Sequence, residues 1–234
     1  MLRASGIDTF YGEYQVLHDV CVEVAEGELV VLFGPNGHGK STLLKTLCGL
    51  VSPVRGSVVF DGSEIGRLSA RDVVEAGLVY VPEERHLFLD MTVKDNLYMG
   101  AYTRRARKKM NESYDLVYHL FPRLKEREKQ YARNLSGGEA QMLTMARGLM
   151  SDARFLAIDE PSLGLAPNLV DQIFASIKTV NDDGLSVLMV EQNVIQACAL
   201  ADRVYLMEEG HIVMDCAAGE ALNDERVKTT LLGA

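Results

Sequence analysis

The sequence contains no apolar run that approaches the roughly 20 residues needed to span a bilayer, and its N-terminus lacks the charged-then-apolar pattern of a signal sequence. We therefore expect any membrane role to be peripheral and to depend on a partner. The sequence also lacks closely spaced cysteine pairs, which excludes a metal site built on such a pair and favours reduced, mostly buried thiols in a cytosolic protein. The four cysteines are scattered at Cys21, Cys48, Cys198 and Cys216.

An excess of positive charge is also lacking: 33 acidic residues outnumber 24 Lys and Arg residues, and the formal net charge of the 234 residues is −9. A general nucleic-acid binder needs a cationic surface, so we expect no nucleic-acid partner. A local basic cluster lies at 104–109, and a solvated helix face is the simpler interpretation of it. Internal repeats and low-complexity tracts are absent. The length allows one large domain or two small ones, with room for a substantial core.

A glycine loop between an apolar run and a helix-like segment is the most informative feature that is present. The apolar residues 29–33 precede the pattern Gly-x4-Gly-Lys-Ser at 34–41, and the helix-like segment 42–47 follows it. Glycines let consecutive backbone N–H groups turn inward, and the helix N-terminus adds free N–H groups and partial positive charge. This context predicts a phosphate loop that binds a nucleoside triphosphate.

Side chains within the loop can complete the binding of phosphate. Lys40 can reach the β- and γ-phosphates, and the Ser41 hydroxyl can ligate Mg²⁺. The residues expected to bind the nucleotide in this segment are Gly34, Pro35, Asn36, Gly37, His38, Gly39, Lys40, Ser41 and Thr42.

Two adjacent carboxylates follow a second apolar strand, 154–158. A buried parallel strand delivers such residues at its carboxyl end, where α/β folds bind ligands. We expect Asp159 to hold Mg²⁺ through water, and Glu160 to polarise the attacking water as a general base. A turn with two acids is the alternative, and the presence of a phosphate loop disfavours it.

The segment Leu135-Ser136-Gly137-Gly138-Glu139 stands before an amphipathic helix at 140–150 and resembles the signature sequence of ATP-binding cassette (ABC) ATPases. Two glycines and a serine at a helix N-terminus can all face a γ-phosphate. A capping box from Ser136 to Glu139 also explains the serine and the glutamate, but not the two consecutive glycines.

In this family the signature faces the ATP held by the other subunit, so the resemblance implies a head-to-tail dimer with two nucleotides at its interface. It covers nearly the whole chain. Tyr11 matches the position where an aromatic ring stacks on adenine, although a packed strand tyrosine is an equal alternative. Residues 161–165 match the D-loop, which crosses the dimer interface. His38 is unusual because a small residue is commoner there, and we expect its side chain to point away from the phosphates.

Two positions depart from the family pattern. Glu83 replaces the Q-loop glutamine, and it can still ligate Mg²⁺ or its water. Gln192 replaces the switch histidine; it can hydrogen-bond a γ-phosphate but cannot carry a proton. We therefore expect catalytic roles for Glu160 and Gln192, and metal-binding roles for Ser41, Glu83 and Asp159.

The patterns and the resemblance together predict an α/β fold. It has a phosphate-loop NTPase (RecA-like) core, an N-terminal antiparallel β subdomain and an inserted helical subdomain. We expect one ABC ATPase domain over 1–234, with the ATP-binding core and β subdomain in 1–90 and 151–234, and the helical subdomain in 91–150 ending in the signature helix. Further elements are predicted as strands at 77–82 and 186–190, a hairpin at 204–213, and helices at 168–180 and 219–231.

The residues around the two replaced positions are similar to one subfamily, the ATPase subunits of branched-chain amino acid importers. Urea and short-amide importer ATPases are also similar. The resemblance implies ATP and Mg²⁺ as cofactors and a peripheral location on the cytoplasmic face of the cell membrane. It also implies a second ATPase subunit, identical or related, and permease subunits. Residues 83–105 would transmit the motion of the ATPase to these permeases. An extracytoplasmic solute-binding protein would be coupled indirectly.

Alternatives outside transport remain. The residues around Glu83 and Gln192, which are similar to the branched-chain amino acid importer subfamily, disfavour a non-transport ABC ATPase such as an iron–sulfur assembly scaffold. A small-molecule kinase shares the phosphate loop but does not need residues 135–139.

Overall fold

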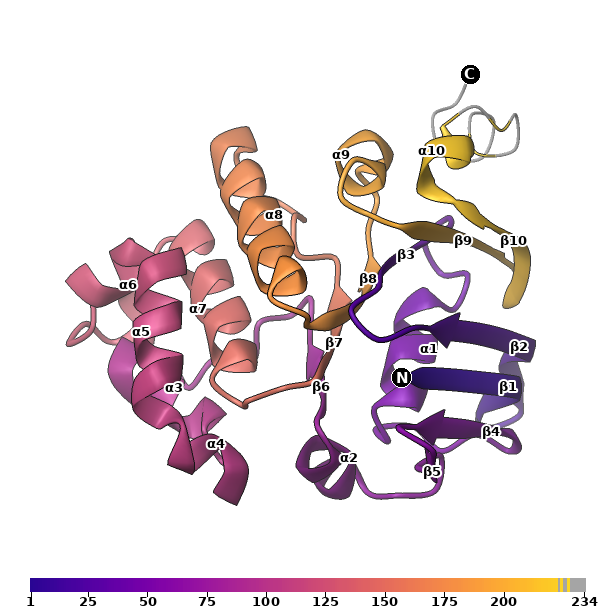
Figure 1. The fold of residues 1–234 in the computed structure, drawn as a ribbon, viewed down its shortest axis with the longest axis horizontal. Coiled ribbons are helices and arrows are strands. Elements are labelled where there is room, and N and C mark those ends of the chain that lie inside the picture. Colours follow the sequence, from indigo (N-terminus) through magenta and orange to yellow (C-terminus); the bar gives the residue numbers. More distant parts are fainter. Residues whose placement is uncertain (223, 225–226, 228–234) are drawn as a thin grey trace.

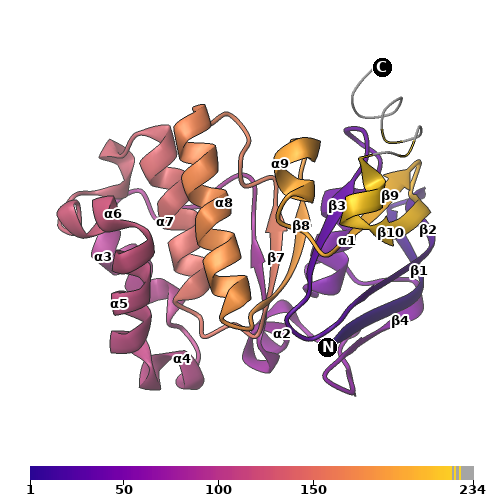
Figure 2. The same cartoon turned by 45° about the horizontal axis from the view of Figure 1, so that its top comes forward.

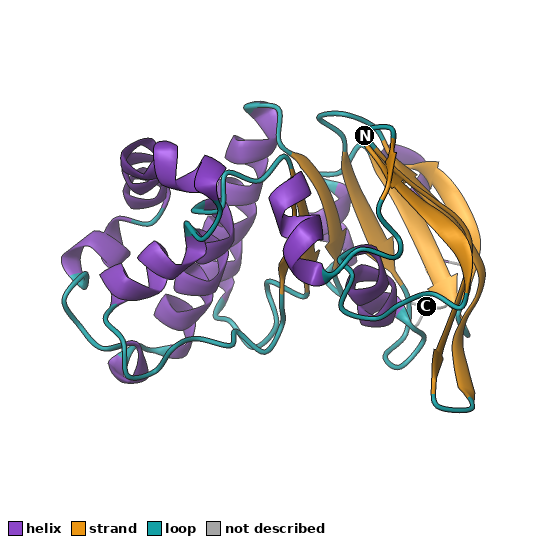
Figure 3. Cartoon of the chain, turned by 90° about the horizontal axis from the view of Figure 1, so that it is seen from below, coloured by secondary structure: helices purple, strands orange, loops and turns teal. Residues whose placement is uncertain are grey.

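The computed structural model describes residues 1–222, 224 and 227. Figure 1 shows two β-sheets at one side of the molecule and a group of helices at the other. Figure 3 shows the same division from below, with strands concentrated at one end and helices at the other. No helix within the described residues is long and apolar enough to cross a membrane.

The larger sheet has six strands in the order β10-β9-β3-β8-β7-β6. Five of them run parallel, and β10 pairs antiparallel with β9 at one edge. The three central strands are buried at every position, as expected for parallel strands covered on both faces. The strands are β3 (Leu29–Phe33), β6 (Leu78–Val81), β7 (Phe155–Asp159), β8 (Ser186–Val190), β9 (Arg203–Glu208) and β10 (His211–Ala217).

The smaller sheet has four antiparallel strands in the order β2-β1-β4-β5. Buried and exposed positions largely alternate along β1, which is the pattern of a sheet with one face on the core. This sheet confirms the predicted N-terminal antiparallel element. Its strands are β1 (Leu2–Tyr11), β2 (Tyr14–Val24), β4 (Arg55–Phe60) and β5 (Ser63–Glu64).

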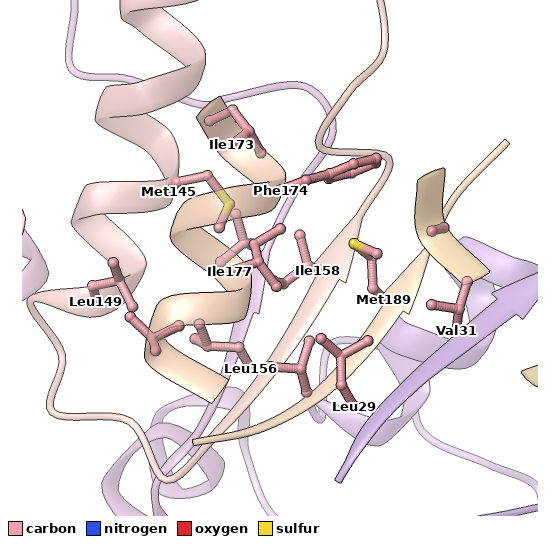
Figure 4. Close-up of a cluster of buried hydrophobic side chains, with 14 of the residues drawn as sticks. Leu29, Val31, Met145, Leu149, Leu156, Ile158, Ile173, Phe174, Ile177 and Met189 are labelled. Carbon is pink, nitrogen blue, oxygen red and sulfur yellow. The ribbon is translucent and has the colours of Figure 1, made fainter. Parts of the chain in front are cut away.

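Successive residues of β3 point to opposite faces and join two hydrophobic clusters. Val30 and Leu32 pack in the cluster that holds the apolar face of α1 (Lys40–Leu47) and the inner face of the smaller sheet. Leu29 and Val31 pack on the other side, against the cluster that includes α8 (Pro167–Asp182). Figure 4 shows this second cluster, and Figure 2 shows α8 lying beside β7 and β8. The central strand that leads into the phosphate loop is therefore fixed from both faces.

The region between β6 and β7 is helical and forms the group of helices at the left of Figure 1. It begins at Thr92, which forms a capping box with Asp95 at the start of its first helix, and α7 packs back against β6. Its division into a separate helical subdomain stays a prediction. The helices are α3 (Val93–Gly100), α4 (Arg104–Lys108), α5 (Met110–Leu120), α6 (Pro122–Glu126), the short η1 (Ala132–Asn134) and α7 (Gly137–Leu149).

Three short helices complete the described chain: α2 (Ala70–Ala76), α9 (Val194–Cys198) and α10 (Ala218–Ala221). The hairpin and the strands predicted after residue 150 are present as β7 to β10. Of the predicted tail helix at 219–231, α10 covers the beginning, and most of the remainder lies outside the described residues.

Candidate functional site: a nucleotide cavity at the carboxyl edge of the parallel sheet

The phosphate loop joins the end of β3 to the start of α1. Its glycines are required by conformation and by space. Gly39 precedes α1 with a φ of 101°, in the left-handed region that side chains rarely adopt. A Cβ on Gly34 would lie 2.2 Å from the backbone oxygen of Met207 in β9. The loop is therefore folded tightly against the sheet, with its backbone N–H groups around the start of α1.

Lys40 is buried inside this loop, with 4% of its surface exposed. Its Nζ donates hydrogen bonds to the backbone oxygens of Gly34, at 2.8 Å, and of Pro35, at 3.0 Å. Burial lowers the pKa of Lys40, and the carboxylates of Glu160 and Asp159 oppose that shift. The ammonium group is held by carbonyl oxygens that a bound phosphate can replace as partners.

Asp159 lies at the end of β7 and touches the phosphate loop directly. Its Oδ1 accepts a hydrogen bond from Ser41 Oγ at 3.0 Å, and its Oδ2 accepts one from the Tyr80 hydroxyl at 2.8 Å. Tyr80 was not among the predicted site residues. Burial, followed by the charge of Asp159, raises the pKa of Tyr80, so the hydroxyl stays protonated and can donate. The tyrosine orients the carboxylate toward Ser41.

Glu160 follows Asp159 with a φ of 43°, which is unusual for a residue other than glycine. This backbone conformation is held by the Glu160 N–H, which donates to the Val190 oxygen at 3.0 Å. The side chain accepts a hydrogen bond from Gln192 Nε2 at 2.6 Å. Burial raises the pKa of Glu160, whereas the Gln192 bond and Lys40 lower it. A more basic carboxylate is a better proton acceptor once it is ionised.

Lys40, Ser41, Glu160 and Gln192 line one cavity of about 450 Å³, whereas Asp159 reaches it through its hydrogen bond with Ser41. The cavity brings the phosphate loop together with Glu83, Glu160 and Gln192, which are far apart in sequence. Val16 and Leu163 also line it and were not among the predicted site residues. A larger cavity of about 700 Å³ contains none of the predicted site residues. The nucleotide cavity is lined by Val16, Asn36, Gly37, Gly39, Lys40, Ser41, Thr42, Glu83, Glu160, Leu163 and Gln192.

The donor set fits Mg²⁺ by its chemistry. Ser41 and Asp159 present oxygen atoms 3.0 Å apart, and Glu83 lines the same cavity. No cluster of three or more His, Cys, Asp or Glu residues suited to a metal occurs in the part of the chain that the structure describes. Mg²⁺ is commonly held by one or two carboxylates together with phosphate oxygens and water, so it needs no such cluster.

Glu191 is a further buried carboxylate that was not predicted. It accepts N–H bonds from Ser162 at 3.0 Å, Gln192 at 2.8 Å and Asn193 at 3.1 Å. These bonds tie the segment after Glu160 to the turn that carries Gln192. Glu191 therefore positions both sides of the Glu160–Gln192 pair without lining the cavity itself.

The predicted adenine-stacking and signature residues do not line this cavity. Tyr11 is 49% exposed at the end of β1. Ser136 caps α7: its Oγ accepts the Glu139 N–H at 3.3 Å, and the Glu139 carboxylate accepts the Ser136 N–H at 2.9 Å. The capping box is present, so it accounts for the serine and the glutamate within one chain.

The two signature glycines differ in their surroundings. A Cβ on Gly138 would lie 2.2 Å from Leu169 Cδ1 of α8, so close helix packing requires a glycine there. A Cβ on Gly137 would have only Arg85 side-chain atoms nearby, at 3.6 Å or more. Packing within the chain therefore explains Gly138 but not Gly137, which leaves the first turn of α7 open to an external ligand.

A parallel sheet with a phosphate loop at its carboxyl edge, and with Asp159 and Glu160 beside that loop, defines a phosphate-loop ATPase of the α/β class. A family model described as "ABC transporter" matches residues 17–163. The chain therefore belongs to the ABC transporter family, as an ABC-type ATPase.

Several relatives and solved structures are similar over the full length. The chain is 45% identical to the high-affinity branched-chain amino acid transport ATP-binding protein BraG of Pseudomonas aeruginosa, over 100% of both chains. It is 36% identical to the probable branched-chain amino acid transport ATP-binding protein LivF of Archaeoglobus fulgidus, over 100% of this chain and 99% of that protein. It is 31% identical to the lipopolysaccharide export system ATP-binding protein LptB of Escherichia coli, over 99% and 97%.

Among solved structures, an ATP-binding cassette of an ABC transporter in its ADP conformation has a TM-score of 0.85 at 25% identity, over 100% of this chain and 99% of that chain. A nucleotide-free ATP-binding cassette has a TM-score of 0.81 at 25% identity, over 99% and 95%. These similarities confirm the predicted fold class.

Proposed function

We propose that this chain is the ATP-hydrolysing subunit of an importer of branched-chain amino acids. The observation that carries the proposal is full-length similarity to two proteins named for that transport, at higher identity than to the lipopolysaccharide export protein. The cavity with Lys40, Glu160 and Gln192 supports the ATPase part. The solute itself would be selected by permease subunits and by an extracytoplasmic binding protein.

In this proposal the phosphate loop binds the β- and γ-phosphates through its backbone N–H groups and Lys40. Ser41, Asp159 and Glu83 would hold Mg²⁺, which supplies charge neutralisation on the phosphate oxygens. Tyr80 and Ser41 keep the Asp159 carboxylate in place through the two hydrogen bonds described above.

Hydrolysis would use the Glu160 carboxylate as the proton acceptor. Glu160 takes a proton from the water whose oxygen bonds to the γ-phosphorus, while the bond from that phosphorus to the bridging oxygen breaks and releases ADP. Gln192 holds Glu160 through its side-chain amide and can donate to the γ-phosphate, but it carries no proton.

Two chains, identical or related, would close head to tail, with Ser136 and Gly137 of one chain facing the ATP of the other. Adenine would stack on Tyr11. Closure and reopening would move permeases that dock on 83–105, with the ATPase lying peripherally on the cytoplasmic face of the membrane.

The structure separates the basic residues at 104–109 into two groups. Arg105 turns inward: its Nε donates to Asp152 Oδ2 at 3.1 Å and its Nη1 donates to the Glu75 oxygen at 2.9 Å. Lys109 also pairs with Asp152, at 3.1 Å. These two residues therefore join α4 and α5 to neighbouring elements. Arg104 is exposed and is the better probe of a docking surface.

Charge reversal of Arg104 to glutamate is expected to lower solute uptake by the assembled transporter about tenfold or more, because like charges brought together at an interface cost several kcal/mol. ATPase activity of the isolated chain should persist, since Arg104 does not line the nucleotide cavity. Uptake and phosphate release would be measured on the same preparations. Lys129→Glu, at an exposed lysine outside 83–105, is the matched control. If Arg104→Glu and Lys129→Glu supported equal uptake, Arg104 would not belong to the docking surface.

The solute assignment is tested by reconstituting the chain with permease subunits and a solute-binding protein from the same source, and by measuring ATP-dependent uptake of radiolabelled leucine. Unlabelled isoleucine and valine should compete, whereas urea and acetamide should not. Uptake of urea or acetamide in place of leucine would favour the alternative importer class. ATP hydrolysis without association with any permease would favour a non-transport ABC ATPase.

A further inference from the structure

The outer side of the phosphate loop is hydrogen-bonded to the hairpin formed by β9 and β10. The Gly210 N–H donates to the His38 backbone oxygen at 3.1 Å, and the Glu209 N–H donates to His38 Nδ1 at 2.9 Å. The His18 N–H of β2 donates to the Gly210 oxygen at 3.0 Å. One residue of the loop thus contacts the hairpin turn through both its backbone and its ring.

The His38 ring does not line the nucleotide cavity. It lines a separate cavity of about 460 Å³ on the hairpin side, as expected for a side chain directed away from the phosphates. The other residues that line this second cavity are Pro35, Glu208, Glu209, His211 and Val213. The ring therefore acts on the nucleotide only through the position of the loop.

The contact between loop, hairpin and β2 leaves little space for adjustment. A Cβ on Gly210 would lie 2.1 Å from the Val16 oxygen and 2.8 Å from the His18 ring. A Cβ on Gly39 would lie 2.9 Å from Leu17 and 3.2 Å from the same Val16 oxygen. Val16 also lines the nucleotide cavity. A shift of the hairpin is thus transmitted to the loop and to the cavity wall by direct contact.

We propose that His38 is a positioning residue whose neutral ring fixes the phosphate loop against the β9–β10 hairpin in the form that binds ATP. This inference rests on nucleotide binding at the site proposed above. The bond from Glu209 requires an unprotonated Nδ1, and a protonated imidazole carries N–H groups on both nitrogens. Histidine is the side chain type that changes charge between pH 5 and 8. Protonation places two donors against each other, so ATP affinity falls as the pH falls.

Several charged and titratable groups face the His38 ring or lie next to it. Glu208 and Glu209 come from the hairpin and line the same cavity as His38. His211 of β10 lines the same cavity and stacks on His18 of β2, with ring centroids 4.9 Å apart. Lys40 lies within the loop itself. The His38 variants described below retain all of these other groups. A comparison of those variants with the wild type therefore isolates the effect of the His38 ring.

The test measures the Kd for ATP by titration at pH 7.5 and pH 5.8. His38→Ala removes the acceptor and should weaken binding about threefold to tenfold at pH 7.5, the range of one net hydrogen bond. His38→Asn places an oxygen near the position of Nδ1 and does not titrate, so it should recover most of that loss. When the pH is lowered from 7.5 to 5.8, the ATP affinity of the wild type should fall relative to that of His38→Asn. The ratio of the affinities of His38→Asn and His38→Ala should stay constant.

Two further variants make the result decisive. His211→Asn removes the other histidine of the cavity and should retain the wild-type pH dependence. Lys40→Ala should lose ATP binding at both pH values. Equal pH dependence in the wild type and His38→Asn, or no rescue by asparagine, would overturn the role of His38 while Lys40→Ala still supports the nucleotide site. Normal binding by Lys40→Ala would instead overturn the site itself.

Discussion

Replacement of Glu160 by glutamine is expected to lower ATP turnover about 100-fold or more while ATP binding persists. Glutamine has nearly the same size, and its side-chain oxygen can still accept the bond from Gln192, but it cannot take a proton from water. ATP should therefore accumulate at the site, and two chains should remain closed around it. Phosphate release, ATP titration and gel filtration with Mg-ATP measure the three effects. A monomer in gel filtration would indicate a related but non-identical natural partner.

The control for this substitution is Glu84→Gln. Glu84 lies on the neighbouring loop with a side chain that is 78% exposed, and it does not line the cavity, so its turnover should match the wild type. If Glu160→Gln also hydrolysed ATP at the normal rate, another group would have to be the general base.

The pH dependence of turnover provides a second view of Glu160. Burial raises its pKa, so the carboxylate becomes protonated at a higher pH than an ordinary glutamate. Turnover at saturating ATP should decline as the pH falls through that raised pKa, and the residual activity of Glu160→Gln should lack the decline. Saturation removes the contribution of ATP affinity, so this profile is independent of the one proposed for His38.

Local patterns predicted those parts of the molecule whose causes are local. The apolar run before Gly34 became the buried strand β3, and the carboxylates Asp159 and Glu160 came at the end of another buried strand. The capping box from Ser136 to Glu139 also formed as its short sequence motif indicates. Each of these features depends on residues within a few positions of one another, so one stretch of sequence contains the whole cause.

Contacts between distant segments were not predictable in the same way. Tyr80 reaches Asp159 only because β6 and β7 are neighbours in the sheet, and His38 reaches Glu209 only because the hairpin follows β3 in strand order. Gly138 is required by Leu169, a residue of a helix that begins after β7. A single sequence does not contain the strand order, and therefore does not contain these pairs.

The sequence alone does not distinguish Arg105 from its exposed neighbours, for the same reason. Five basic residues in six positions resemble a solvated face, and only the fold shows that Asp152, 47 residues later, lies beside Arg105. One Arg105 nitrogen, Nη2, is buried without a hydrogen-bond partner, which further separates this residue from a simple surface cation. Charge reversal at Arg105 would disturb the packing of α4, so it is a poor test of partner docking.

The position of Ser136 in the fold predicts a second large effect on ATP hydrolysis. Ser136 does not line the nucleotide cavity of its own chain, whereas Lys40 does. If each ATP lies between Lys40 of one chain and Ser136 of the other, Lys40→Ala should sharply weaken ATP binding. Ser136→Arg should block closure by placing a long cation against the opposite nucleotide. Each variant alone should then hydrolyse ATP at a small fraction of the wild-type rate.

Mixing the two variants distinguishes a shared site from a site within one chain. A mixed dimer contains one interface with both defects and one interface that combines the intact Lys40 of one chain with the intact Ser136 of the other. If each site works alone, the mixture should recover activity that neither variant shows. If both sites are needed, the mixture should still trap nucleotide at one site per dimer. A mixture that shows neither recovery nor trapping would contradict the shared site.

Two controls separate the proposed contact from helix capping. Ser136→Ala removes the cap, at a cost of about 1 kcal/mol of stability, without adding bulk or charge. Asn134→Arg adds the same side chain at an exposed position just before the signature. If the contact across the dimer matters, Ser136→Arg should lose far more activity than either control at the same extent of folding, measured by circular dichroism. Wild-type turnover and dimerisation in Ser136→Arg would mean that Ser136 is only the cap of α7.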